Sequence, residues 1–117
     1  MTEARVRSAL KLVLASIPEQ DRRSLGRWEA ELTTLPAGVL AETRLLLWER
    51  GHVITFGEER CAALSDDALA ELAAHELAHV LCKRGGVRLS DESAAHDQAR
   101  AWGFAPRTLL REIGGAP

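Results

Sequence analysis

The N-terminal third of the chain carries two segments whose apolar residues follow helical spacing. Residues 3–16 place their apolar side chains on one face, with arginine and lysine side chains elsewhere. A second helix is expected over residues 21–32, because Trp28 and Leu32 lie four positions apart. The pattern therefore predicts a helical part over residues 1–36.

The middle of the chain contains two short runs rich in strand-forming residues. They cover residues 42–49 and 52–57 and are separated by Arg50 and Gly51. Because glycine can adopt the positive φ of a tight turn, the two runs predict a β-hairpin at this point.

Two capped helices follow the predicted hairpin. Ser65 and the two aspartates after it are typical of a helix start, and we expect that helix to run to about Lys83, before the pair Gly85–Gly86. A second cap at residues 90–92 opens a helix that we expect to end before Gly103.

These elements predict an α+β fold in a single domain over residues 1–117. Residues 40–105 form its expected core unit, and residues 106–117 form a C-terminal tail. The tail has three apolar residues at helical spacing, which we expect to pack on the core: Leu109, Leu110 and Ile113.

Composition excludes several classes of protein. Lys and Arg number 15 against 17 Asp and Glu, for a formal net charge of −2, so a dedicated nucleic-acid surface is not expected. No apolar run is long enough for a membrane span, and the N-terminus lacks a signal-peptide pattern, which favours the cytoplasm. The two cysteines, Cys61 and Cys82, are expected to be reduced. The sequence leaves the oligomeric state open.

The strongest chemical signal is the pentapeptide from His75 to His79, which has the pattern H-E-x-x-H inside the longest predicted helix. Four residues make about one helical turn, so both imidazoles leave the same face and can bind one metal ion. Glu76 stands beside that position and can take a proton from a metal-activated water. The alternative is a helix face with two ordinary histidines, but the surrounding run is nearly uncharged, and unpartnered buried polar groups are costly.

A catalytic zinc site with two histidines needs a third protein ligand and leaves a position for water. The candidates in the following helix are Glu92, His96 and Asp97, since the glycine pair lets that helix fold back on the first. We favour Glu92, although an acid in the first turn of a helix also complements the helix dipole. Cys82 is more simply interpreted as a small apolar residue than as a soft ligand.

The stretch HELAHVL followed by ESAAHDQARAWGF resembles the gluzincin metallopeptidases, and the chain is closest in size to the minigluzincins. It is also similar to the E-x-x-A-D-x-x-A form found in HtpX-like and CAAX prenyl protease peptidases. The resemblance, over about residues 50–105, implies a minimal zincin-like fold with His75, His79 and Glu92 as zinc ligands and Glu76 as general base. His96 stands where the family has an aspartate.

Three roles remain open for His96: orienting a ligand histidine, stabilising the oxyanion of the reaction, or ligating the metal. The chain has no tyrosine, so the candidate oxyanion donors are His96, His52, Arg100 or a backbone N–H. His52 itself is more typical of a solvated residue at the end of a strand.

The resulting functional prediction is a zinc-dependent metallopeptidase with one Zn²⁺ per chain and a peptide or protein substrate. If the strand His52–Gly57 forms the sheet edge, a substrate can add to it as a further strand. The alternative is a non-catalytic metal-binding or partner-binding module that keeps a zincin scaffold. A third hypothesis, latency, places the tail after Pro106 in the cleft.

Overall fold

The structure is a computed structural model that describes residues 2–35, 39–46 and 51–114. Its elements, in chain order, are α1 (Thr2–Ser16), α2 (Glu19–Ser24), β1 (Trp28–Thr33), β2 (Ala41–Leu46), β3 (Gly51–Gly57), α3 (Glu58–Ala62), α4 (Asp66–Arg84), α5 (Glu92–Ala101) and α6 (Arg107–Glu112). The α+β class predicted from the sequence is confirmed.

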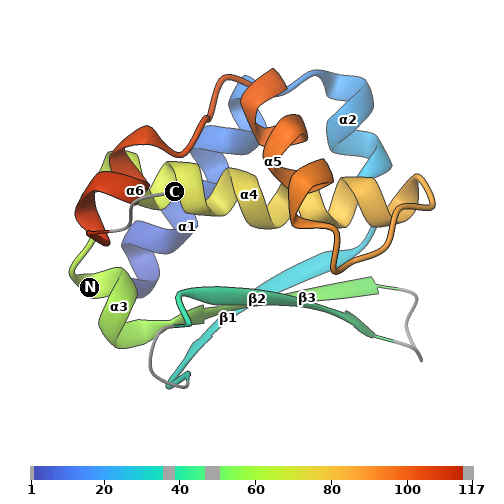
Figure 1. The fold of residues 1–117 in the computed structure, drawn as a ribbon. Helices are drawn as coiled ribbons and strands as arrows, with labels where there is room; N and C mark the ends of the chain where they lie inside the picture. The colour runs from blue at the N-terminus through green and yellow to red at the C-terminus, as the bar shows by residue number, and fades with distance from the viewer. Residues whose placement is uncertain (1, 36–38, 47–50, 115–117) are drawn as a thin grey trace.

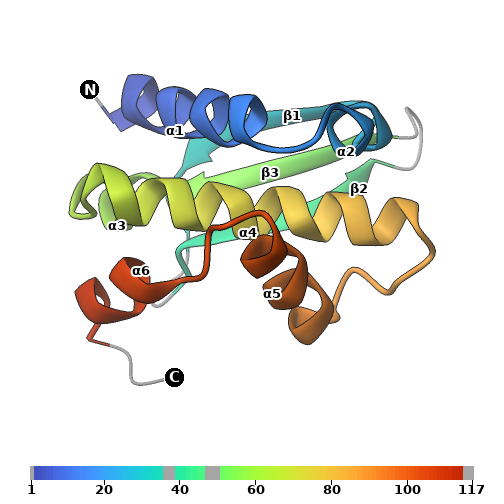
Figure 2. The same ribbon diagram turned by 90° about the horizontal axis from the view of Figure 1, so that it is seen from above.

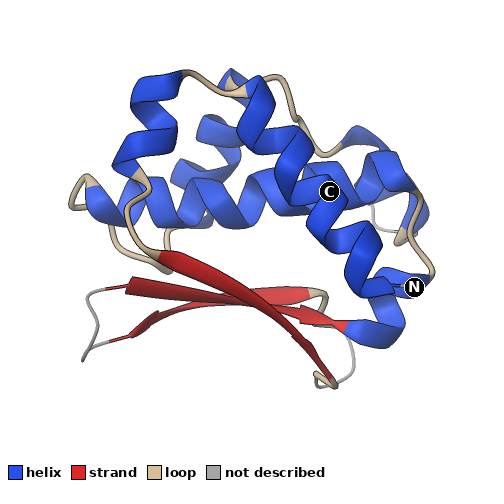
Figure 3. Ribbon diagram, turned by 180° about the vertical axis from the view of Figure 1, so that it is seen from behind, coloured by secondary structure: helices blue, strands red, loops and turns tan. Residues whose placement is uncertain are grey.

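The molecule has two layers, with the sheet on one side and the helices on the other (Figure 1). Seen from above the helices, α4 lies between α1 on one side and α5 and α6 on the other (Figure 2). The view from behind shows the same separation of helices and strands (Figure 3). Helix α4 therefore has neighbours on both flanks and the sheet beneath it, which explains why most of its side chains are buried.

The sheet has the order β1-β3-β2, with β1 parallel and β2 antiparallel to β3. The predicted pairing of the two middle runs is confirmed, since Leu46 pairs with Gly51 in an antiparallel register. The predicted turn at Arg50 falls partly on residues 47–50, outside the described residues. Gly51 belongs to the strand, where a Cβ would come 3.1 Å from the carbonyl oxygen of Arg27, so close backbone approach accounts for this glycine.

The expectation that the strand His52–Gly57 lies at the sheet edge is wrong. β3 is the central strand, and every residue in it is buried. Its residues Ile54 and Phe56 face the helices and join the hydrophobic core, while Val53 and Thr55 are buried on the other face. A peptide cannot add to a strand that already has partners on both sides.

The expected helix over residues 21–32 is also wrong in its second half. Helix α2 ends at Ser24, and Gly26 takes a φ of +66°, which reverses the chain before β1 begins at Trp28. Exposure then alternates along the strand, with Trp28, Ala30 and Leu32 partly buried against the core. Residues four apart share a face in a strand as well as in a helix, so the spacing of Trp28 and Leu32 did not distinguish the two.

Helix α4 starts and ends where the sequence predicts. The hydroxyl of Ser65 accepts a hydrogen bond from the backbone N–H of Ala68 at 3.2 Å, which caps the start of the helix. The carboxylate of Glu112 accepts from the backbone N–H of Ser65 at 2.7 Å and from its hydroxyl, so the end of α6 is tied to the start of α4. Gly86, with a φ of +94°, follows the last turn.

Helices α5 and α6 are fixed by polar contacts as well as by apolar packing. Asp91 caps α5 by accepting from the backbone N–H of Ala94 at 2.9 Å. At the other end of α5, the indole N–H of Trp102 donates to Asp21 at 2.8 Å, which ties α5 to α2. On α6, Leu109 is buried in the core, as expected for the tail. No helix within the described residues combines the length and apolarity needed to cross a bilayer.

Candidate metal centre

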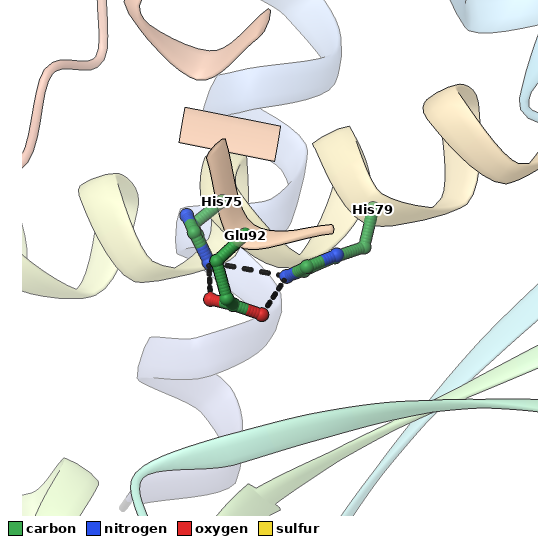
Figure 4. Close-up of side chains that lie close together, drawn as sticks. All are labelled: His75, His79 and Glu92. Atoms are coloured by element: carbon green, nitrogen blue, oxygen red, sulfur yellow. Dashed lines mark hydrogen bonds and ion pairs between the residues drawn. The ribbon is translucent and has the colours of Figure 1, made fainter. Parts of the chain in front are cut away.

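Helix α4 places His75 and His79 one turn apart on the face that turns toward α5 and the sheet. Their rings lie nearly perpendicular, at 87°, with centroids 4.8 Å apart. The two Nε2 atoms are separated by 3.2 Å and point toward a common position (Figure 4). The helical spacing read from the sequence thus brings both imidazoles together.

Glu92 completes this group from the first turn of α5. Its Oε1 lies 3.0 Å from Nε2 of His75 and its Oε2 lies 2.9 Å from Nε2 of His79, so the carboxylate faces both rings (Figure 4). One ligand atom from each of the three residues falls within 4.8 Å of the others. The sequence prediction selected these three residues, and the structure brings them together.

The donor set suits a divalent zinc ion. Two imidazole nitrogens and one carboxylate oxygen are common protein ligands of catalytic zinc, at about 2.0–2.2 Å from the metal. In a regular tetrahedron with those bond lengths, neighbouring donor atoms lie about 3.3–3.5 Å apart. The two Nε2 atoms are 3.2 Å apart, slightly closer than this, and each lies about as close to a different oxygen of Glu92, at 3.0 and 2.9 Å, so the side chains would have to move outward to accommodate an ion. Burial lowers the pKa of His79, which favours the neutral form that a metal ligand needs.

Glu76 lies next to this group and is 5% exposed. Its carboxylate accepts a hydrogen bond from the hydroxyl of Thr43 at 2.8 Å. Burial raises the pKa of Glu76, while the bond from Thr43 acts in the opposite direction by stabilising the charged form. A carboxylate with a raised pKa is a better proton acceptor than an exposed one, which suits the predicted role of general base.

Thr43 was not among the residues selected from the sequence. It belongs to β2 and pairs with Ile54 of the central strand, so its side chain points to the helix face of the sheet. Its neighbours Glu42 and Arg44 are exposed on the opposite face. This alternation of outward charged residues with an inward hydroxyl is the signal that could have identified it.

His96 lies on α5 near this candidate metal-binding group and is not one of its three members. The guanidinium of Arg100 donates to Nε2 of His96 at 2.9 Å, so this nitrogen acts as the acceptor of that hydrogen bond. Within the described residues, neither His96 nor Arg100 forms a hydrogen bond with His75 or His79. The three roles considered for His96, orienting a ligand histidine, stabilising the oxyanion or ligating the metal, stay predictions.

Two other residues considered from the sequence, His52 and Cys82, are not members of the group. His52 is 1% exposed, which contradicts the expectation of a solvated strand end, and neither ring nitrogen has a hydrogen-bond partner among the described residues. Burial and the nearby charges of Arg84 and Lys83 lower its pKa. Cys82 is partly buried near the end of α4, and burial raises the pKa of its thiol.

Two cavities border the group of His75, His79 and Glu92. A polar cavity of about 200 Å³ is lined by Glu76, His79 and Glu92 together with three residues of β2, Ala41, Glu42 and Thr43. A larger and more apolar cavity of about 480 Å³ borders His75 and Glu92 on the side of α6. Helix α6 thus packs on the core, as expected for the tail, and also lines a cavity beside the group. The hypothesis that the tail makes the protein latent stays a prediction.

Comparison with known proteins leaves the family open. No protein-family model, no curated protein and no solved structure matches this chain. The resemblance to gluzincins therefore remains a hypothesis that depends on the motif and on the geometry described above.

Proposed function

We propose that this protein is a small zinc-dependent metallopeptidase of the gluzincin type. The observation that carries the proposal is the convergence of His75, His79 and Glu92 within 4.8 Å, with the carboxylate of Glu76 buried beside them. A purely structural zinc site has no need for a buried base next to its ligands.

In this proposal the three ligands hold Zn²⁺, which when bound supplies Lewis acidity toward water and toward a peptide carbonyl. Glu76 takes the proton of the attacking water and delivers it to the amine that leaves. Thr43 holds the carboxylate of Glu76 through its hydroxyl, so that the base keeps one orientation during proton transfer.

The edge strand β2 is the natural place for an extended substrate. Within the described sheet, β3 pairs with one side of β2 and no strand pairs with the other side. Residues of β2 also line the polar cavity at the ligand group. We therefore assign strand addition to β2, in place of the strand His52–Gly57 favoured by the sequence.

The test combines zinc analysis with cleavage of an unfolded protein such as reduced, alkylated casein. We expect about one zinc per chain, and we expect Glu76→Gln to keep the zinc and lose at least about 100-fold in cleavage rate. As a matched control, Glu71→Gln alters a glutamate of the same helix whose carboxylate accepts from the backbone of α6 instead of facing the ligands. Undiminished cleavage by Glu76→Gln would show that the base is wrongly assigned. Bound zinc without cleavage by the wild type would favour the non-catalytic module.

A further inference from the structure

The larger cavity beside the ligand group has an apolar wall that the proposed chemistry does not explain. Its volume is about 480 Å³, which is enough for a large side chain. His75 and Glu92 border it, and its apolar lining includes Leu72 of α4, Leu110 of α6 and Ile113 just after α6. A side chain placed in this cavity would therefore lie directly beside the proposed scissile bond.

A second cavity of about 480 Å³ continues from the first between α5 and α6, and the two share His96, Pro106 and Leu110. Arg100 from α5 and Arg107 from α6 line this second cavity. Among the described residues that line it there is no aspartate or glutamate, and the ion pairs of the described residues include neither arginine. The second cavity is thus positively charged.

The two arginines have donors available for an anion. Arg100 donates one N–H to His96, which leaves the other N–H groups of its guanidinium for a further acceptor. Arg107 is exposed at the start of α6. Guanidinium groups bind carboxylates in a planar, two-point geometry, so two of them at one cavity favour a carboxylate over a neutral group.

We propose that the cleft selects peptides in which a large apolar residue is followed by a carboxylate. The apolar side chain occupies the cavity walled by α6, and the carboxylate binds Arg100 and Arg107. This inference rests on the proposed peptidase function and names its substrate class. The carboxylate can be the end of the peptide chain or the side chain of the next residue, and the test separates the two.

Binding is measured by fluorescence anisotropy on the full-length chain carrying Glu76→Gln, with zinc added, so that no peptide is consumed. Four labelled probes share the sequence Ala-Ala-Leu: one has a free carboxylate, one an amide end, one a following Asp-amide and one a following Asn-amide. We expect about tenfold tighter binding of one carboxylate probe than of its neutral partner, and a smaller difference at high salt. The first pair reports a chain end and the second pair an acidic side chain.

Charge-reversal variants test whether Arg100 and Arg107 contact the carboxylate of the probe. Arg100→Glu and Arg107→Glu should each remove the preference for the carboxylate probe, whereas Arg111→Glu, an exposed arginine of α6 that lines neither cavity, should keep it. Leu110→Trp should weaken binding of the leucine probes by at least tenfold and spare probes with alanine in place of leucine.

The outcomes separate this inference from the proposed function. Equal affinities within both probe pairs, or no binding of any probe, would overturn the inference. A retained preference together with no cleavage by wild-type protein would overturn the peptidase function alone. In a chain that keeps Glu76, Arg100→Glu would lower kcat for all peptides if Arg100 were an oxyanion donor, whereas loss of a carboxylate contact would raise KM for the carboxylate peptides only.

Discussion

The hydrogen bond between Thr43 and Glu76 gives a quantitative prediction for a residue outside the H-E-x-x-H motif. The hydroxyl of Thr43 lies 2.8 Å from a carboxylate that is 5% exposed, so water cannot easily replace it. A hydrogen bond to a charged group contributes about 1.5–3 kcal/mol. If the bond orients the base in the transition state, Thr43→Val should lower kcat/KM by about 10- to 150-fold, since about 1.4 kcal/mol corresponds to a factor of ten.

The assay compares three variants by steady-state cleavage of one fluorogenic peptide, with zinc content and melting temperature measured on the same samples. Thr43→Ser keeps the hydroxyl and should retain at least about a third of the wild-type rate, while Thr43→Val should not. Thr33→Val changes an exposed threonine on the opposite edge strand, β1, and serves as the matched control. We expect the zinc content to stay constant in all three, because Thr43 is not one of the three proposed ligands.

The reasoning would be refuted by a Thr43→Val protein that carries zinc and cleaves within twofold of the wild type. It would also be refuted if Thr43→Ser and Thr43→Val lost activity equally, because the shared change would then be one of packing. A fall confined to kcat, with KM unchanged, would support a role in orienting the base.

Two further predictions concern zinc binding and the pH dependence of stability. Glu92→Ala should weaken zinc binding by more than about 100-fold in a competition titration with a chromogenic chelator, because it removes one of three proposed ligands, whereas His96→Ala should bind zinc within about threefold of the wild type. Burial lowers the pKa of His52, so the folded state binds a proton at this residue less readily than the unfolded state does. The free energy of unfolding is therefore unaffected by this residue's titration above its unfolded pKa of about 6.5, and it decreases as the pH falls below that value. Urea unfolding of metal-free protein between pH 7.5 and 5 should therefore show a smaller loss of stability on acidification for His52→Leu than for the wild type, and parallel curves would contradict this assignment.

Local patterns in the sequence were sufficient to predict the ligand group. Helical periodicity fixes the relative direction of side chains four residues apart, so His75 and His79 share a face whatever surrounds the helix. The glycine pair after α4 predicts a reversal, and the cap at Asp91 sets where α5 begins, which leaves Glu92 in its first turn. Each of these steps depends on neighbours in sequence, and for that reason each agrees with the structure.

The strand order of the sheet depends on contacts between residues far apart in the chain, and local sequence patterns do not determine such contacts. Trp28 of β1 pairs directly with His52 of β3, although β2 lies between these two strands in the chain, and no turn signal links them. The hairpin pattern gives only the pairing of β2 with β3 and cannot say which of them has a second partner. The burial of His52 follows from the same fact, because a strand covered on both sides has no solvated end at this position.

Assigning the residues of β1 to a helix explains two errors of the sequence prediction, namely the choice of edge strand and the failure to select Thr43. If residues 28–33 are taken as a strand parallel to β3, then β3 has two neighbours and β2 must be the edge. The charged residues Glu42 and Arg44 would then point to the uncovered face of the sheet, and Thr43 between them would point to the helix that carries Glu76. The edge strand and the partner of the proposed base thus both follow from assigning β1, whereas the proposed metal-binding group does not depend on it.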